Sequence, residues 1–467
     1  MFVRFNSTLL FTTLIIFSML TSIPSLSSAH DKAIADNTET SDPVLNIVNK
    51  ATSILPKKKE LDFLHWGFEQ RVRQEYIKNG FRLSKQETNP NYFRFRTRLW
   101  FELTPAQWID FYVRFTDEFR AWMTPHAASD LSEVVFDNIY FTIKRPFDLP
   151  VSIRFGRQDI VYGNGFILKE GTPMDGSRTM YFDGIKSTLH LDSIKTDIDA
   201  LVLETNRNDR KFFKFNPSDF NLVEDEIRAY GYYITSNYFD NIKLEQYYLY
   251  KRANGQPFEN SDFSDNEKLN TFGARISGSV CDNFSYESEL AVQTGRQGPL
   301  QRTGLGTYVL GKYKFPICFS PALTAGYFYL SGDDPDTDKR EDWDPLFGRW
   351  TQPLQSELML FTYIREGGIA RWTNMHKFRL AGELQPVSWC TLSVMYDRML
   401  ADENTYIGTT GFGSGKTRGN LLTFAGKFKF NKQVTALGYV EYFDPGDYYA
   451  RTADPALFLR WELKFKY

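Results

Sequence analysis

The last eleven residues of the chain alternate between apolar and polar side chains almost without interruption. One set of alternate positions is apolar or aromatic: Leu457, Leu459, Trp461, Leu463, Phe465 and Tyr467. The other set is mostly charged: Phe458, Arg460, Glu462, Lys464 and Lys466. Because successive side chains of a strand point to opposite faces, this pattern predicts a strand with one apolar face and one charged face. Its length matches the roughly 9–11 residues that a tilted strand needs to cross a bilayer.

The place of this strand in the chain adds to the prediction. A strand in a soluble sheet shows the same alternation, but outer-membrane barrels of Gram-negative bacteria typically end on such a strand, with an aromatic last residue. We therefore expect an all-β fold, an antiparallel transmembrane β-barrel surrounded by outer-membrane lipid. We also expect the barrel-assembly machinery to recognise the C-terminal strand.

The N-terminal residues predict export from the cytoplasm. Arg4 precedes an apolar run from Leu9 to Leu20, and Pro24 and Ala29 follow it. This is the pattern of a secretory signal peptide, which we assign to residues 1–29. We assign residues 30–61 to a periplasmic N-terminal segment, with one short helix over about 41–55, and residues 62–467 to the barrel.

The composition agrees with a barrel and excludes other classes of protein. Aromatic residues make up 16% of the chain, yet no further stretch approaches the roughly 18 consecutive apolar residues of a spanning helix. A barrel distributes its hydrophobicity in this way, since only alternate residues face lipid. The formal net charge of −2 argues against nucleic acid as a partner. The three cysteines suggest neither a disulfide framework nor a zinc site, and we expect no cofactor and no metal.

The chain contains eighteen candidate strands, an even number, as bacterial barrels have. They lie near residues 62–76, 90–104, 108–121, 133–145, 149–159, 179–191, 194–206, 224–236, 239–252, 268–280, 283–295, 303–315, 318–331, 372–385, 388–399, 417–430, 433–443 and 456–467. Short and long connections take turns along most of the chain. The long ones include 160–178, 207–223, 253–267, 332–371 and 400–416. This predicts periplasmic turns and extracellular loops.

Basic residues share one face of several early strands. A Lys or Arg on the lipid face costs about 2–4 kcal/mol at the midplane, so these residues should face inward. They are Arg71, Arg73, Arg94, Arg96, Arg98, Arg114 and Arg154, and the acidic residues nearby are Glu69, Glu75, Asp110 and Glu118. Arginine rings in pores favour anions. The alternative is that these charges pair with one another and stiffen the wall.

Two segments resemble the alginate export family of outer-membrane channels. The first contains Phe155-Gly156-Arg157-Gln158, Tyr162-Gly163-Asn164-Gly165 and Tyr181-Phe182-Asp183-Gly184. The second contains Ser331-Gly332-Asp333-Asp334 and Trp343-Asp344-Pro345-Leu346-Phe347. The resemblance covers about residues 62–467, and it implies an 18-stranded barrel whose basic lumen selects an anionic polyuronate.

The resemblance also implies that Arg157 and Asp183 line the lumen. The alternation of the fifth strand places Arg157 on the lipid face instead, unless Gly156 forms a bulge. A second departure concerns gating. Alginate exporters have long loops on both sides of the membrane, whereas the periplasmic connections here are mostly short.

Enzymatic function has little support in the sequence, and we expect no catalytic residues. A lipase or protease needs a serine–histidine or aspartate–histidine constellation, and no recognisable motif surrounds the histidines of the mature chain: His30, His65, His126, His190 and His376. A transporter with a plug domain has about 22 strands, and residues 30–61 are too few to form a plug.

Three hypotheses remain from the sequence. The first is a passive outer-membrane channel whose arginine-rich lumen passes an anionic polysaccharide or a small anionic solute. The second is a general or sugar porin in which the wall charges are structural. The third is a non-conducting surface adhesin whose working part is the loop over residues 332–371.

Overall fold

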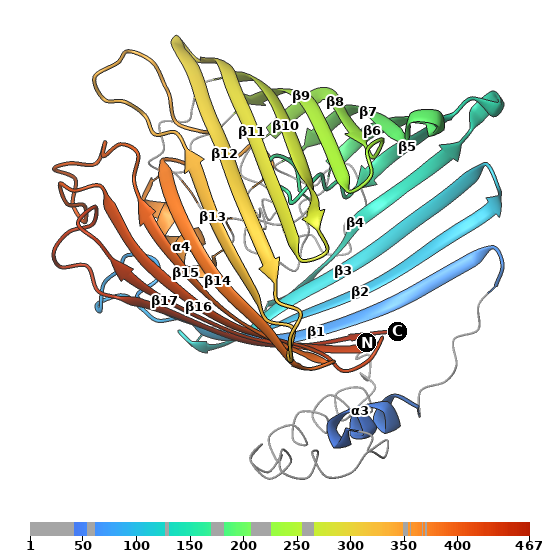
Figure 1. Cartoon of the computed structure of the whole chain (residues 1–467), viewed down its shortest axis with the longest axis horizontal. Coiled ribbons are helices and arrows are strands. Elements are labelled where there is room, and N and C mark those ends of the chain that lie inside the picture. The colour runs from blue at the N-terminus through green and yellow to red at the C-terminus, as the bar shows by residue number, and fades with distance from the viewer. Residues whose placement is uncertain are drawn as a thin grey trace.

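The computed structural model describes residues 42–53, 61–126, 130–169, 182–206, 226–254, 266–348, 354, 356–366, 368 and 371–467. These residues form one closed barrel of eighteen antiparallel strands (Figure 1). The predicted signal peptide lies outside the described residues. Among the described residues, no helix is long and apolar enough to cross a membrane.

The strands alternate in direction between two ends of the barrel, which we call the turn end and the loop end. The strands that run toward the loop end are β1 (Leu64–Lys78), β3 (Ile109–Thr124), β5 (Val151–Gln158), β7 (Thr196–Thr205), β9 (Ile242–Asn254), β11 (Phe284–Gln297), β13 (Ala322–Leu330), β15 (Cys390–Leu400) and β17 (Val434–Pro445). Those that return to the turn end are β2 (Asn91–Ala106), β4 (Asp130–Lys144), β6 (Phe182–Leu191), β8 (Glu226–Ser236), β10 (Glu267–Cys281), β12 (Leu300–Lys314), β14 (Met375–Val387), β16 (Thr417–Lys429) and β18 (Ala456–Lys466). The prediction of eighteen strands is confirmed.

In the part of the chain that the structure describes, helical structure lies in the connections and in the N-terminal segment. Among the described residues the two α-helices are α3 (Pro43–Ser53) and α4 (Glu357–Thr362). Three short 3-10 turns complete the description: η1 (Pro146–Asp148), η2 (Asp192–Ile194) and η3 (Tyr363–Glu366).

The first and last strands close the barrel. Each strand pairs with its neighbours in sequence, and β18 also pairs with β1 from Glu69↔Lys466 to Lys78↔Leu457. The backbone of Tyr467 adds two hydrogen bonds to Phe68, at 2.8 and 3.0 Å. Closure matters because hydrocarbon offers no partner to an unpaired N–H or C=O group, and a closed barrel has no edge strand.

The connections sort by end, as the sequence predicts. Short turns such as 282–283 and 388–389 join strands at the turn end, and long connections such as 331–374 join them at the loop end. Two connections at the loop end are also short: residues 125–129 between β3 and β4, and Gly298 and Pro299 between β11 and β12. Figure 1 shows the contrast between the two ends.

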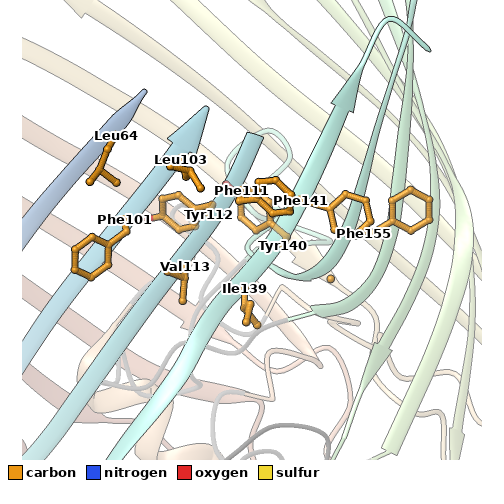
Figure 2. A pocket seen from close by; sticks show the side chains of 11 residues that line it. Leu64, Phe101, Leu103, Phe111, Tyr112, Val113, Ile139, Tyr140, Phe141 and Phe155 are labelled. Carbon is orange, nitrogen blue, oxygen red and sulfur yellow. The ribbon is translucent and has the colours of Figure 1, made fainter. Parts of the chain in front are cut away.

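The wall has a polar inner face and an apolar outer face. On β18, Leu459 points outward and Arg460, which is 7% exposed, points inward, as the alternation predicts. Outward aromatic rings contact one another across strands: Phe95 stacks on Phe119, and Phe141 stacks on Phe155. Figure 2 shows a shallow depression on this outer face, lined by apolar side chains of β1 to β5. It faces lipid, so we do not assign a polar solute to it.

The N-terminal helix α3 packs on the outside of the barrel near the turn end. Val48 contacts a cluster of outward residues, namely Phe430, Val434 and Leu463. The indole Nε1 of Trp389 donates a hydrogen bond to Asp42 Oδ2 at 2.6 Å, just before the helix begins. The predicted helix near 41–55 is therefore present, and it neither hangs free nor enters the lumen.

Gly156 has a backbone that other residues rarely adopt. Its φ is +122°, and a Cβ there would lie 2.3 Å from the carbonyl oxygen of Ile139. We expect Gly156→Ala to lower the free energy of unfolding by about 1–3 kcal/mol, measured by urea titration of the purified barrel in detergent. Gly438→Ala is the matched control, because a Cβ on β17 at that position meets no atom within 4 Å. Equal stability of the two variants would contradict the strain at Gly156.

Candidate functional site on the inner wall

Arginines of three neighbouring strands form a continuous basic surface on the inner face, which we call the arginine wall. Its members are Arg71 and Arg73 on β1, Arg94, Arg96 and Arg98 on β2, and Arg114 and Arg120 on β3. Two rows of three cations cross the sheet in register: Arg120–Arg94–Arg73 and Arg96–Arg71–Lys464. Like charges directly opposite one another destabilise a sheet, so such rows require compensation.

Carboxylates beside the rows supply part of this compensation. Glu118 accepts a hydrogen bond from Arg94, and Glu69 Oε1 lies 2.6 Å from Arg96 Nη2. Glu75 Oε1 lies 2.9 Å from Arg73 Nε. The cations and anions therefore form a network, in which removal of one partner leaves a buried charge uncompensated.

Exposure to water differs among the arginines, and Arg120 on the loop-end side is the most open of the arginine wall, with 29% of its side chain exposed. Arg114 pairs with Asp137, with Nε at 2.9 Å from both carboxylate oxygens, and with Asp159 at 2.6 Å. Arg98 lies 3.6 Å from Asp137. The side chains of Arg98 and Arg114 are 15% and 14% exposed, against 3% for Arg71 and 0% for Arg73. Arg98 and Arg114 are therefore more available to a solute than Arg71 and Arg73.

Arg154 on β5 lies beside this surface and is held differently. Its Nε donates to the Thr142 hydroxyl at 3.2 Å, and its guanidinium lies 4.3 Å from the centre of the Tyr140 ring. No carboxylate among the described residues is within ion-pair distance of Arg154. Its charge is therefore not neutralised by a direct partner.

The β5–β6 connection folds into the barrel and contacts its far wall. We call residues 159–169 the first inner loop. The Tyr162 hydroxyl donates to Asp199 at 2.6 Å, and the Tyr162 ring stacks on Tyr233 of β8 with centroids 3.8 Å apart. Asn164 donates to Glu287 of β11. A loop that starts on β5 thus reaches β11 across the lumen.

The β13–β14 connection, residues 331–374, is the second inner loop and carries α4. Every residue of α4 is buried, and α4 contacts β17 and β18, whereas residues 334–339 of the loop are exposed. The Leu358 N–H donates to Glu441 of β17 at 2.8 Å. Glu366, at the end of η3, makes a two-point ion pair with Arg418 of β16 at 2.6 and 2.8 Å.

One ion-pair chain joins the second inner loop to the arginine wall. Arg460 of β18 donates to Glu357 of α4 at 2.7 Å and to Glu75 of β1 at 2.8 Å. Glu75 also contacts Arg73. The position of α4 is therefore coupled to the closing strand pair and to the rows of cations.

The two inner loops meet in the middle of the barrel. Leu168 and Phe347 form a parallel backbone bridge, and the Phe347 N–H donates to the Ile167 carbonyl at 3.0 Å. The Phe166 ring stacks on Trp343 with centroids 5.4 Å apart. These residues belong to the larger of the two buried apolar clusters that the described residues form. The width of the lumen therefore depends on both loops as well as on the strand number.

Charges also hold the second inner loop against β12. Burial alone would raise the pKa of the Asp342 carboxyl, but Arg302, Arg371 and Arg340 hold this pKa well below its usual range. Asp342 therefore stays ionised at neutral pH, since a lowered pKa means that its charge is lost only in strong acid. Lys251 of β9 donates to Asp344 at 2.8 Å.

The wall opposite the arginines has a different character. Buried tyrosines there donate to carboxylates: Tyr247 to Glu289 at 2.9 Å, and Tyr308 to both Glu289 and Glu287. Arg275 is the cation at the centre of this group. The inner surface is thus basic along β1 to β3 and rich in tyrosine and carboxylate along β8 to β12.

Arg157 and Asp183 form a pair that lies apart from the arginine wall. Arg157 Nε lies 2.8 Å from Asp183 Oδ1, and Arg157 is 1% exposed. The register sets Asp183 opposite Glu204, and the next outward residues along these two strands are Ile185 and Val202. The lumen role that the resemblance implies for Arg157 and Asp183 is not supported by this register, and no register shift occurs at Gly156.

The structure assembles one constellation that no sequence motif reveals. The Ser152 hydroxyl lies 3.1 Å from His190 Nε2, and His190 Nδ1 lies 2.8 Å from Asp197 Oδ1. The three residues come from β5, β6 and β7: His190 is directly opposite Asp197, and Ser152, which is opposite Thr188, reaches His190 diagonally. A hydrolase also needs N–H groups free to bind an oxyanion, whereas Ser152 is paired on both sides within the sheet. We therefore interpret the group as a hydrogen-bond chain of the wall.

The sequence missed some members of the site. Arg120 continues the inward parity of Arg114 and Glu118, so the same alternation would have found it. The inner loops carry no period-2 or helical pattern, and their contacts with the wall have no local signal. Glu357 and Glu366 could be found only from the structure.

The comparison with protein families gives one clear result. The family model described as alginate export matches residues 62–461, which is most of the chain and nearly all of the barrel. A search of curated proteins gave no match.

Solved structures of outer-membrane porins from Pseudomonas aeruginosa share the fold. OccK3 (OpdO) superposes with a TM-score of 0.55 at 10% identity, covering 86% of this chain and 95% of that one. OccK7 (OpdD) superposes with a TM-score of 0.54 at 10% identity, covering 87% of this chain and 99% of that one. OprD superposes with a TM-score of 0.52 at 11% identity, covering 86% of this chain and 95% of that one. At these identities the likeness shows the fold alone. Taken with the family match and the closed barrel, it leads to the conclusion that the chain belongs to the alginate export family and is a β-barrel channel of the Gram-negative outer membrane.

Proposed function

We propose that the channel passes anionic saccharides or small anionic solutes by passive diffusion along the arginine wall. The observation that carries the proposal is the pair of in-register cation rows on β1 to β3 and β18. A sheet keeps like charges opposite one another at a cost, which an anionic solute offsets. Guanidinium groups bind carboxylates by two parallel hydrogen bonds, so they suit a polyuronate or a carboxylated sugar.

The solute path runs where the basic residues are accessible. On the turn-end side these are Arg98, Arg114 and Arg154, which we assign to direct contact with the solute; Arg96, which is 8% exposed, borders them. Arg71, Arg73 and Arg94 are more deeply buried, and they contribute to the positive electrostatic potential that attracts the anion rather than contacting it. Exposed lysines at the inner turn-end rim, Lys427, Lys429 and Lys466, extend the basic surface toward the periplasm.

A second candidate is a general or sugar porin whose wall charges are structural. The ion pairs of Arg94, Arg96 and Arg114 with carboxylates favour it, because a neutralised arginine attracts an anion less strongly. Arg154 separates the two candidates, since it has no such partner among the described residues.

Ion selectivity tests the anion path. We expect Arg98→Gln combined with Arg154→Gln to lower the anion-to-cation permeability ratio at least about threefold, because both cations are accessible from the lumen. The reversal potential of single channels in a planar bilayer under a salt gradient measures the ratio.

The matched control carries the same charge change on the outer face. Arg252→Gln combined with Arg296→Gln should leave the permeability ratio unchanged, because these side chains point away from the lumen. An unchanged ratio in the inner double variant, with normal conductance, would favour the structural role of the wall charges.

Conductance tests the role of the second inner loop. We expect replacement of residues 333–371 by a short Gly-Ser linker to raise single-channel conductance severalfold, because α4 and its neighbours fill part of the lumen. The ends of β13 and β14 pair directly at Leu330↔Met375, so a linker can join them.

The same variant distinguishes a channel from an adhesin. Replacing residues 407–410, which are exposed in another loop-end connection, serves as the control and should change conductance much less. If neither the intact protein nor the loop variant conducts, although both migrate as folded barrels in gels, the channel function is excluded.

A further inference from the structure

A row of four basic residues crosses the outer face of the barrel near the loop end. Arg228 on β8 pairs with Arg252 on β9, Arg252 with Lys268 on β10, and Lys268 with Arg296 on β11. We call these four residues the basic row. We propose that the basic row binds the headgroup phosphates of a phosphorylated glycolipid in the outer leaflet.

The row lies on the outer face, as its neighbours show. On the same four strands the alternate residues point inward and are buried, among them Ala229, Lys251, Leu269 and Gln297. The four members of the row are all exposed. None is more than two residues from the loop-end limit of its strand.

The row has almost no compensation within the protein. Arg228 has one partner, Glu204 at 3.6 Å, and its side chain is 77% exposed. Across the part of the chain that the structure describes, no carboxylate lies within ion-pair distance of Arg252, Lys268 or Arg296. On the inner wall, by contrast, carboxylates intersperse the cation rows. Three adjacent like charges in register therefore favour an external anion.

Tyrosines fix the depth of the row relative to the bilayer. Two residues further from the loop end, Tyr230 and Tyr250 pair with ring centroids 4.7 Å apart. Tyr232 and Tyr248 lie two residues further still from the loop end, and the ring centroids of Tyr248 and Phe272 are 4.9 Å apart. Tyrosine belts mark the boundary between hydrocarbon and headgroups.

On β10 and β11 the outer surface becomes apolar at the level of Tyr248, because Tyr248 is in register with Phe272, and Phe272 with Val292. Phe272, Val292 and Leu290 are each about half exposed and belong to the band that faces acyl chains. From the loop end toward mid-barrel, the basic row is followed by tyrosines on β8 and β9 and by the polar Asn270 and Thr294 on β10 and β11. Apolar residues come next. This order matches a lipid with phosphate above, a polar sugar backbone at the tyrosines and acyl chains below. A free phosphate ion accounts for the basic row but not for the two layers beneath it.

Binding of a defined lipid tests the inference. The intact chain, freed of lipid in a neutral detergent, is titrated with diphosphorylated lipid A and with the same lipid after dephosphorylation, and bound lipid is counted by native mass spectrometry. We expect the phosphorylated lipid to bind more tightly, and the triple change Arg252→Gln, Lys268→Gln and Arg296→Gln to weaken its binding at least about tenfold, since each basic residue near a charged lipid surface contributes about 1 kcal/mol.

The control has the same loss of charge at the other end of the barrel. Lys195→Gln, Lys314→Gln and Lys432→Gln change exposed residues at the turn end and should leave lipid binding as in the wild type. Equal binding of the two lipids to the wild type, or equal binding of phosphorylated lipid to the wild type and the triple variant, overturns the proposal. Displacement of the lipid by excess inorganic phosphate also overturns it, because a site for the free ion would then suffice.

Stability provides a second readout that does not depend on counting lipids. Removing like charges should leave the lipid-free triple variant at least as stable to heat as the wild type. Added phosphorylated lipid should raise the melting temperature of the wild type and not that of the variant. If the triple variant does not form a barrel, Arg252→Gln and Lys268→Gln are measured singly. About fivefold weaker binding for each is expected, and unchanged binding in both overturns the proposal.

Discussion

The closed ladder of backbone hydrogen bonds is the constraint on which the rest of the molecule depends. In hydrocarbon an unpaired peptide group costs several kcal/mol, so every strand needs two neighbours and the first must meet the last. Once the ladder is closed, each side chain has only two directions, toward lipid or toward the lumen. The aromatic outer band and the charged inner wall both follow from this choice.

The inner wall places many charges where water is scarce. Such groups are tolerated when each charge has a partner of opposite sign, and the loss of one partner is more costly than the pair is stabilising. Arg73, Glu75 and Arg460 show how this works across the closing strands, with Glu357 of α4 as a further partner. The same contacts that compensate charge therefore position the second inner loop.

The sequence predicted the features that depend on period-2 alternation. All eighteen strands, their directions and the inward face of β18 follow from side chains two residues apart, and the structure confirms them. The alternation placed Arg157 on the lipid face, whereas the family resemblance implied that Arg157 lines the lumen. The register of β5 has no shift at Gly156 and agrees with the alternation. Features that depend on chain segments distant in sequence were not accessible. The contact of Leu168 with Phe347, the chain of Ser152, His190 and Asp197, and the docking of α3 on Val434 and Leu463 have no local pattern.

Arg460 belongs both to the strand that completes the barrel and to the ion pairs that hold α4. A slip of β18 by one residue against β1 would turn every side chain of the strand to the other face. Arg460 would then enter lipid, and Glu357 and Glu75 would both lose their shared cation. The correct register of the closing strands and the position of α4 in the lumen therefore depend on the same side chain. A barrel closed in the wrong register would also lose the ion pair that holds α4.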